Sequence, residues 1–134
     1  MEIYLDFDGT VVEHFYPEIG EYNSGAIEVI NRLQKAGHNI ILNTVRVELE
    51  NKTFEAAVNF LNSIIGYEIV SPENSTKSKI TPCPWNWDLF NTHQTIFIDD
   101  VCEGIPLKSN KKLPDGKMVD WTQLDIEFLK HKIY

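Results

Sequence analysis

Residues 2–10 read EIYLDFDGT, and this stretch decides the fold that we expect for the chain. Its apolar residues 3–5 predict a buried strand over residues 2–6. Two carboxylates, Asp6 and Asp8, follow at the end of that strand. Because an unpaired charge is costly to bury, these acids must lie in a solvated turn or receive a positively charged partner.

Short apolar runs recur along the chain and alternate with segments of helical period. Further strands are expected at residues 39–44, 67–70 and 95–98. A turn over residues 113–116 predicts a short edge strand near Met118. The proline-rich stretch 71–84 is expected to be a loop.

The first two expected helices carry recognisable end signals. The first has apolar residues at 26, 29, 30 and 33, a cap at Asn23 or Ser24, and a stop at Gly37. The second covers residues 54–65 and stops at Gly66.

Two more helices are expected in the second half of the chain. A short one covers residues 85–90. The last begins at Asp120, with Gln123 as its capping-box partner. Three apolar residues would dock it on the core: Leu124, Phe128 and Leu129.

Strands that alternate with helices imply right-handed crossovers and a mostly parallel sheet. We therefore expect residues 1–134 to form a single α/β domain. The expected fold is a three-layer, Rossmann-like arrangement with a mostly parallel central sheet and helices on both faces. In such open sheets the ligand site lies at the carboxyl ends of the strands.

Three strand ends would converge at that edge and bring together residues far apart in the sequence. The crevice would contain four carboxylates, a hydroxyl and a guanidinium. In chain order these groups belong to Asp6, Asp8, Thr44, Arg46, Asp99 and Asp100.

Four neighbouring carboxylates need a partner. Two like charges about 4 Å apart repel by roughly 4 kcal/mol at an effective dielectric of about 20. Such acids escape repulsion by holding a proton or by sharing a hard cation. Oxygen ligands without histidine or cysteine favour Mg²⁺ over zinc, and such Mg²⁺ sites usually complete their shell with phosphate oxygens.

The residues around the acids suit a phosphorylated ligand. Gly9 lets the backbone approach an anion closely, and the Thr44 hydroxyl can donate to phosphate oxygens. Asp6, at the strand tip, could attack phosphorus, which is a known mode of covalent catalysis. Asp8 could give a proton to the leaving group and later retake one.

Three segments resemble motifs of the haloacid dehalogenase-like superfamily in its phosphatase form. Residues 6–12 are similar to its first motif, residues 40–44 to its second, and residues 96–100 to its fourth, acidic motif. Residues 13–20 further resemble small bacterial members described only as hydrolases.

The resemblance implies a role for each acid. Asp6 would be the nucleophile that forms an aspartyl-phosphate, and Asp8 the general acid/base. Asp6, the backbone carbonyl of Asp8, and Asp99 would hold Mg²⁺, with Asp100 supporting them or contributing through water. Thr44 would bind the transferring phosphoryl group.

The family's third motif supplies a lysine, or sometimes an arginine, that neutralises the phosphoryl charge. Lys77 and Lys79 lie at suitable spacing before the strand at 95–98, and Lys79 is preferred. Arg46 is a further candidate. His14, in the loop after the first strand, could contact a leaving group, but a solvated side chain is expected.

The composition of the chain argues against some classes of binding partner. The net charge of −8 argues against non-specific binding to nucleic acid or to anionic membranes. No apolar stretch approaches the roughly 20 residues of a membrane helix. The two cysteines form no paired motif, so a reducing, cytoplasmic location is expected.

The expected function is Mg²⁺-dependent hydrolysis of a small phosphorylated metabolite. The spacing of the motifs leaves room for little or no cap domain. An open site suits bulky substrates, such as a nucleic-acid 3′-phosphate or a phosphoprotein, and homo-oligomerisation can close one around small molecules. The remaining alternative is a non-catalytic phosphate-binding module that retains the fold.

Overall fold

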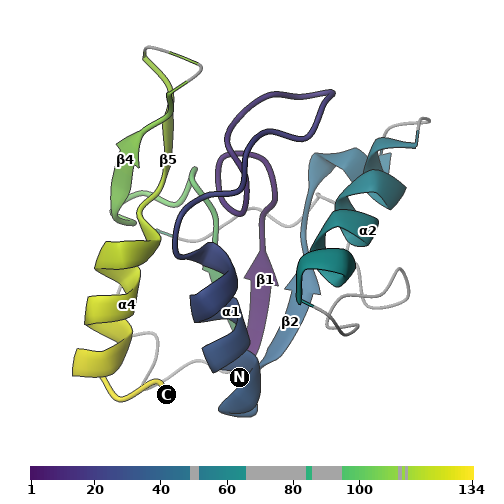
Figure 1. Cartoon of the computed structure of the whole chain (residues 1–134). Helices are drawn as coiled ribbons and strands as arrows, with labels where there is room; N and C mark the ends of the chain where they lie inside the picture. Colours follow the sequence, from purple (N-terminus) through teal and green to yellow (C-terminus); the bar gives the residue numbers. More distant parts are fainter. Residues whose placement is uncertain (49–51, 66–83, 86–94, 112, 114) are drawn as a thin grey trace.

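A computed structural model of the chain describes residues 1–48, 52–65, 84–85, 95–111, 113 and 115–134 (Figure 1). Within these residues, three parallel strands form a sheet in the order β2-β1-β3. Their bounds are Glu2–Leu5 for β1, Asn39–Leu42 for β2 and Thr95–Ile98 for β3. The mixed α/β class and the parallel pairing of these strands are therefore confirmed.

Four helical elements and a hairpin complete the described structure. The helices are α1 (Ala26–Lys35), the 3₁₀ helix η1 (Val45–Glu48), α2 (Thr53–Ile65) and α4 (Trp121–Lys130). Strands β4 (Leu107–Ser109) and β5 (Lys117–Val119) pair antiparallel in a separate sheet. None of the described helices is long and apolar enough to cross a membrane.

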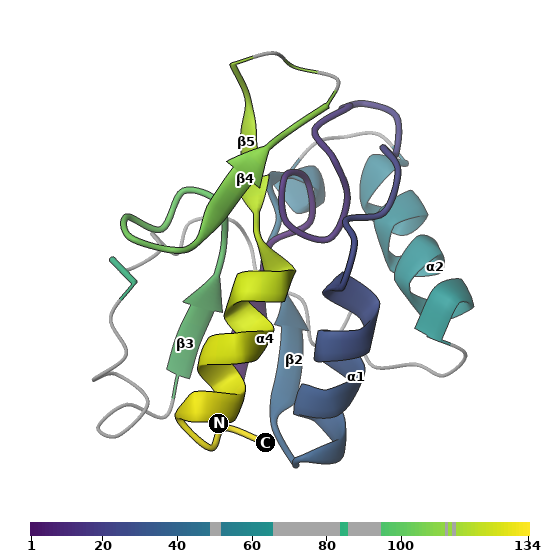
Figure 2. The same ribbon diagram turned by 60° about the vertical axis from the view of Figure 1, so that its left-hand side comes forward.

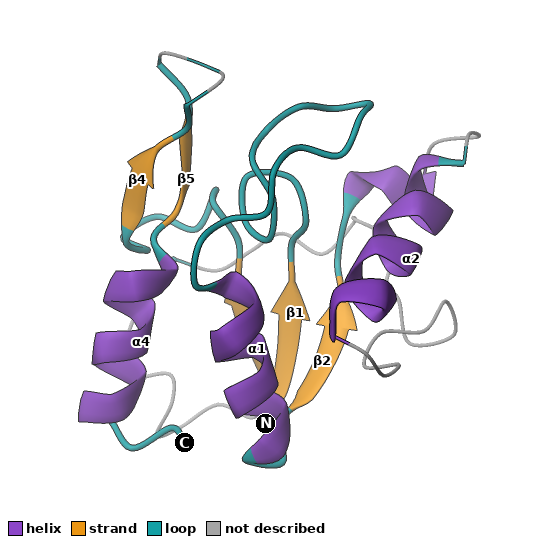
Figure 3. Ribbon diagram, viewed as in Figure 1, coloured by secondary structure: helices purple, strands orange, loops and turns teal. Residues whose placement is uncertain are grey.

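The register of the sheet sets the position of the site. Leu5 of β1 lies opposite Leu42 of β2 and Ile98 of β3, so the three strands end at the same level. Figure 3 shows the loops gathered above the arrowheads of β1 and β2. Chain segments that leave the three strands therefore meet at one edge of the sheet.

Helices α1 and α4 lie side by side on one face of the sheet, and α2 contacts the other side of α1 near β2 (Figures 1 and 2). The second helical layer of the expected three-layer arrangement stays a prediction. The strand expected at 67–70, most of the loop at 71–84 and nearly all of the helix at 85–90 lie outside the described residues.

Helix α1 ends as expected but begins differently. Gly37 has a φ of 94°, its N–H donates to Gln34 O, and the next N–H, of His38, donates to Leu33 O. This pair of bonds is a Schellman motif, which confirms the stop at Gly37. The cap predicted at Asn23 or Ser24 is wrong, because the N-cap is Gly25, with a φ of 87° and no side-chain cap bond.

Asn23 has another structural role. Its side-chain amide donates to Thr10 O at 2.9 Å and to Val119 O at 2.7 Å. The indole of Trp121 also donates to Thr10 O, at 2.7 Å. The loop after β1 is thereby tied to β5 and to the start of α4, and these links hold the acidic turn against the core.

The prediction for helix α4 is confirmed in part. The Asp120 side chain accepts a bond from the Gln123 backbone N–H, as a cap should. The reciprocal capping-box bond is replaced, because the Asp120 N–H donates to Pro106 O. Leu124 and Phe128 are fully buried, whereas Leu129 is 54% exposed, so its docking role was wrongly predicted.

The hairpin was predicted in part. Gly116 N donates to Leu113 O, which confirms a turn there, and Met118 lies in the expected strand, β5. Its partner β4 was not predicted, because Leu107–Ser109 is too short to show a strand period.

Candidate functional site

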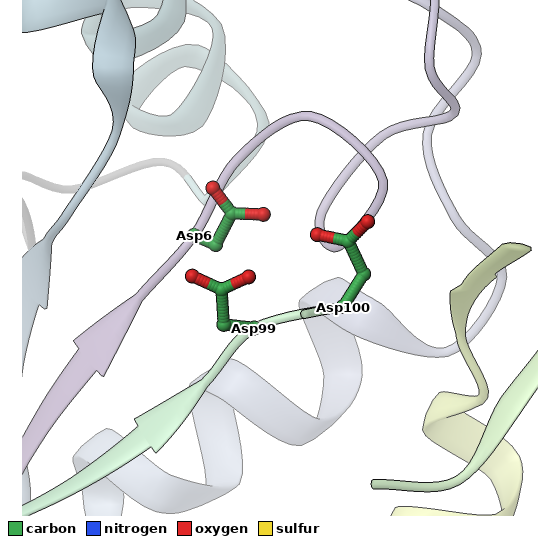
Figure 4. A group of neighbouring side chains, drawn as sticks. All are labelled: Asp6, Asp99 and Asp100. Carbon is green, nitrogen blue, oxygen red and sulfur yellow. The ribbon is translucent and has the colours of Figure 1, made fainter. Parts of the chain in front are cut away.

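Three carboxylates gather where β1 and β3 end. The ladder continues past both strands, since Asp6 N donates to Ile98 O at 3.0 Å. This pairing sets Asp6 beside Asp99, the residue that follows β3. Asp6, Asp99 and Asp100 each place a carboxylate oxygen within 4.8 Å of the others (Figure 4). The predicted convergence of these strand ends is therefore present in the structure.

The Thr10 side chain links the two halves of this cluster. Its hydroxyl donates to Asp6 Oδ2 at 2.9 Å and accepts from the Asp100 N–H at 3.3 Å. Asp99 Oδ1 accepts from the Val101 N–H at 3.0 Å. No role was predicted for Thr10, although its hydroxyl lies in the same turn as Asp6. These bonds fix the orientation of the carboxylates before any ligand arrives.

The electrostatics of the cluster are unfavourable without a cation. Burial, then the charge of Asp99, then Asp100 raise the pKa of Asp6 well above its ordinary value. Burial and the nearby Asp100 raise the pKa of Asp99 to about 6, against the opposing effect of the Val101 N–H. Both shifts disfavour the charged form and have the sign expected when like charges share a poorly solvated site.

The donor set fits a hard divalent cation. It consists of three carboxylates from two adjacent strand ends, and two of them have pKa values raised by burial and mutual repulsion. A cation bound among them would remove that repulsion. Oxygen donors alone favour Mg²⁺ or a similar ion over zinc.

His14 lies against the cluster, so the expectation of a solvated side chain is wrong. Its Nε2 is 2.9 Å from Asp100 Oδ2, and the imidazole is 31% exposed. The hydrogen bond to Asp100 is the main reason that the pKa of His14 is raised. His14 and Asp100 are far apart in the sequence, and no local pattern pointed to this pair.

Gly9 is the residue that makes room for this imidazole. Its φ is 80°, and a Cβ at this position would overlap the ring of His14. We expect Gly9→Ala to lower the free energy of unfolding by at least about 1–2 kcal/mol, the cost of a left-handed backbone for a residue with a Cβ. It should also displace His14 from Asp100.

Chemical denaturation of Gly9→Ala and of Gly37→Ala provides the measurement. Gly37 also has a positive φ, 94°, but a Cβ there would meet nothing within 4 Å. The two variants therefore share the backbone cost, and Gly9→Ala alone should change the chemical shifts of the His14 ring. Equal stability losses and an unchanged His14 resonance would contradict this assignment.

The Asp8 side chain belongs to a separate pair. Arg46 Nε donates to Asp8 Oδ2 and Arg46 Nη2 to Asp8 Oδ1, both at 2.7 Å. Asp8 is not a member of the three-carboxylate cluster found among the described residues. The expectation that four carboxylates share one cluster is thus corrected to three plus an ion pair. The metal role of the Asp8 carbonyl stays a prediction.

The guanidinium of Arg46 donates all of its hydrogen bonds to groups within the protein. Its guanidinium has five N–H donors, and all five are used: two by Asp8 and three by the carbonyls of Pro17, Glu18 and Thr53. These contacts leave no Arg46 donor for a phosphoryl group in this arrangement, so they do not support the phosphate role predicted for it.

Of the other residues predicted to bind phosphate, Thr44 and Gly9 lie within the described part of the chain and the two lysines do not. Thr44 follows β2 and is buried, and its Oγ1 accepts from the Arg46 N–H at 3.3 Å. Gly9 N donates to Val12 O within the turn. The phosphate roles of both residues stay predictions. Lys77 and Lys79 lie outside the described residues.

Comparison with known proteins bears on the fold. No family model matches the chain, and no curated protein does. It is similar to the solved structure of a conserved protein from Bacteroides thetaiotaomicron, with a TM-score of 0.59 and 26% sequence identity. The match covers 98% of this chain and 91% of that one. This similarity supports the mixed α/β architecture.

Proposed function

We propose that the chain is a Mg²⁺-dependent phosphomonoester hydrolase that works through an aspartyl-phosphate on Asp6. The observation that carries the proposal is the cluster of Asp6, Asp99 and Asp100 at the ends of two adjacent parallel strands. The pKa values of Asp6 and Asp99 are raised by burial and by the neighbouring acids, and a bound cation would offset that repulsion. Magnesium and a phosphate ester together match this oxygen-only donor set.

The resemblance to the haloacid dehalogenase-like superfamily supports the same proposal. The segment at 6–12 directly follows β1, and the segments at 40–44 and 96–100 include the ends of β2 and β3 and the residues after them; the three strands share one sheet and end at one edge. On this proposal the complete chain has the three-layer, Rossmann-like fold of that superfamily, with little or no cap. The substrate is a small phosphorylated metabolite, and the protein works in the cytoplasm.

Asp6 and Asp99 are the residues that would hold Mg²⁺, with Asp100 beside them. When bound, the ion would neutralise the carboxylates and the oxygens of the phosphoryl group. It would thereby make Asp6, whose pKa is raised in the free protein, available as a carboxylate. Thr10 would orient Asp6 through its hydrogen bond to Oδ2.

The proposed reaction has two steps. In the first, an oxygen of Asp6 forms a bond to phosphorus, the bond to the leaving-group oxygen breaks, and Asp8 gives that oxygen a proton. In the second, water attacks the same phosphorus, the bond to Asp6 breaks, and Asp8 takes the proton of the water. Thr44 would donate its hydroxyl to the transferring group, and Lys79 or Lys77 would neutralise its charge.

A panel of phosphomonoesters tests this function. Purified protein would be incubated with sugar phosphates, nucleotides, phosphorylated amino acids and an aryl phosphate, with Mg²⁺ or with a chelator. The proposal predicts release of inorganic phosphate that requires Mg²⁺. A protein that binds Mg²⁺ but releases no phosphate from any of these esters would indicate a non-catalytic phosphate-binding module.

A further inference from the structure

We propose that Arg46 is a positioning residue that fixes Asp8 as the base for the second step, the hydrolysis of the aspartyl-phosphate. This inference rests on the proposed function and deepens it. Asp8 must exchange a proton, yet both of its carboxylate oxygens are held by the guanidinium of Arg46.

Arg46 and Asp8 form a bidentate ion pair. The two N–H···O distances are both 2.7 Å, at the short end of the range for charge-assisted bonds. A guanidinium that binds both oxygens of a carboxylate fixes the plane of that carboxylate as well as its position. The orientation of Asp8 is therefore set by the orientation of Arg46.

Arg46 is itself held on every side. It is fully buried, and its remaining donors bind Pro17 O at 3.2 Å, Glu18 O at 2.9 Å and Thr53 O at 3.3 Å. Its guanidinium carbon lies 5.2 Å from the ring centre of Phe7 and 5.0 Å from that of Tyr16. Rings at these distances add a cation–π attraction.

These contacts come from three separate parts of the chain. Phe7 and Asp8 follow β1, Tyr16 to Glu18 lie in the loop after it, and Thr53 begins α2. Arg46 lies in η1, two residues after Thr44. The guanidinium therefore ties the acidic turn to the loop at residues 13–22 and to the start of α2.

The Asp8 side chain is partly exposed. Its exposed fraction is 15%, whereas that of the Arg46 side chain is 0%. On this inference, the exposed part of Asp8 is its open side, which a water would approach. Arg46 contributes only N–H donors to the pair, so the proton exchanged in the reaction would be carried by Asp8.

This arrangement assigns the pair to the second step. A water approaching the open side of Asp8 would lose its proton to the carboxylate while its oxygen bonds to phosphorus. The bond between phosphorus and Asp6 breaks, and its electron pair returns to the Asp6 carboxylate. Inorganic phosphate leaves, and Asp8 keeps the proton for the next leaving group.

Pre-steady-state kinetics with p-nitrophenyl phosphate separate the two steps. Its leaving group departs as a stable anion, so the first step needs little help from an acid. In Arg46→Met we expect a burst of p-nitrophenolate close to one equivalent per active site, followed by slow turnover. The rate of the slow phase should be about 100-fold lower than in wild type, which is the effect of misplacing a catalytic group by about 1 Å.

Three further variants complete the design. Asp8→Asn should give the same burst, with slow turnover reduced by about 10²–10⁴-fold, the usual contribution of a general base. Arg46→Lys keeps the charge but loses the planar fork, so its slow phase should lie between wild type and Arg46→Met. Arg32→Met removes another arginine–aspartate pair, Arg32 with Asp125 at 2.8 Å in the last turn of α1, and should leave both phases unchanged.

The outcomes distinguish this inference from the function on which it rests. Wild-type protein with no Asp6-dependent turnover would overturn the proposed function and the inference with it. Wild-type turnover combined with an equal loss of burst rate and slow rate in the Arg46 variants would overturn the inference alone, since a general structural role affects both steps. If Arg46→Met does not fold, the ratio of the two rates in Arg46→Lys decides.

Discussion

Replacing Asp6 by Asn is expected to abolish Mg²⁺-dependent release of phosphate from phosphomonoesters, with a loss of at least about 10⁴-fold in kcat. The change keeps the size and shape of the side chain but removes the oxygen that would attack phosphorus. It also removes one of the three carboxylates that would hold the cation. Both effects act on the reaction and leave the core untouched.

The stability of the same variant provides the control. The pKa of Asp6 is raised well above its ordinary value, so the ionised carboxylate opposes folding in the metal-free protein. Asp6→Asn should therefore unfold at the same or a higher denaturant concentration than wild type at neutral pH without Mg²⁺. Retained phosphatase activity in a folded Asp6→Asn protein would exclude Asp6 as the nucleophile.

The second large expected effect is that pH and Mg²⁺ change the stability of the folded protein through the carboxylate cluster. Burial is the main reason that the pKa of Asp99 is raised from 3.8 to about 6. The folded state therefore holds the Asp99 proton more tightly than the unfolded state does. Below about pH 4 this proton stabilises the folded state to its full extent. The stabilisation is lost as the pH rises through about 6, which lowers the free energy of unfolding by on the order of 3 kcal/mol.

Mg²⁺ should reverse this loss, because it binds the ionised form. We expect the metal-free protein to lose stability between pH 4 and about pH 7, and millimolar Mg²⁺ to restore it at pH 7 and above. Denaturation curves with Mg²⁺ or with chelator, measured across this pH range, give the comparison. A free energy of unfolding that does not respond to Mg²⁺ at any pH would contradict the predicted site.

Asp99→Asn isolates the contribution of this carboxylate. Without Mg²⁺ the variant should be more stable than wild type at pH 7 and should lose the part of the pH dependence that Asp99 causes. Its affinity for Mg²⁺ should fall by more than the roughly 10–100-fold that the loss of an indirect partner costs. Asp125→Asn, whose carboxylate pairs with Arg32 outside the cluster, should keep wild-type Mg²⁺ affinity.

The sequence predicted those parts of the fold that depend on local patterns. The strands at β1, β2 and β3 stand out because short apolar runs end in polar turns. Helix α1 stops just before Gly37, because glycine adopts a φ of 94° without the steric cost of a side chain. The gathering of Asp6 and Asp99 at one edge was predicted, because the carboxyl ends of parallel strands meet at the same edge of a sheet. That β1 and β3 are direct neighbours was not predicted.

Contacts between distant segments could not be predicted in this way. Asp8 and Arg46 are 38 positions apart, and His14 and Asp100 are 86 apart. Both pairs depend on the path of the loop at residues 13–22, which has no periodic pattern. Leu129 shows a different limit: α4 buries the face that carries Leu124 and Phe128, and the next residue points away from it.

The central claim is that phosphate is transferred through Asp6, and one measurement addresses it directly. Asp8→Asn protein would be mixed with an aryl phosphate and Mg²⁺, quenched in acid, digested and analysed by mass spectrometry. We predict a phosphoryl group on the peptide that contains Asp6, present only with Mg²⁺ and absent from the double variant that also carries Asp6→Asn. Phosphate release by the wild-type protein, without a phosphoryl group on Asp6 in this experiment, would contradict the account.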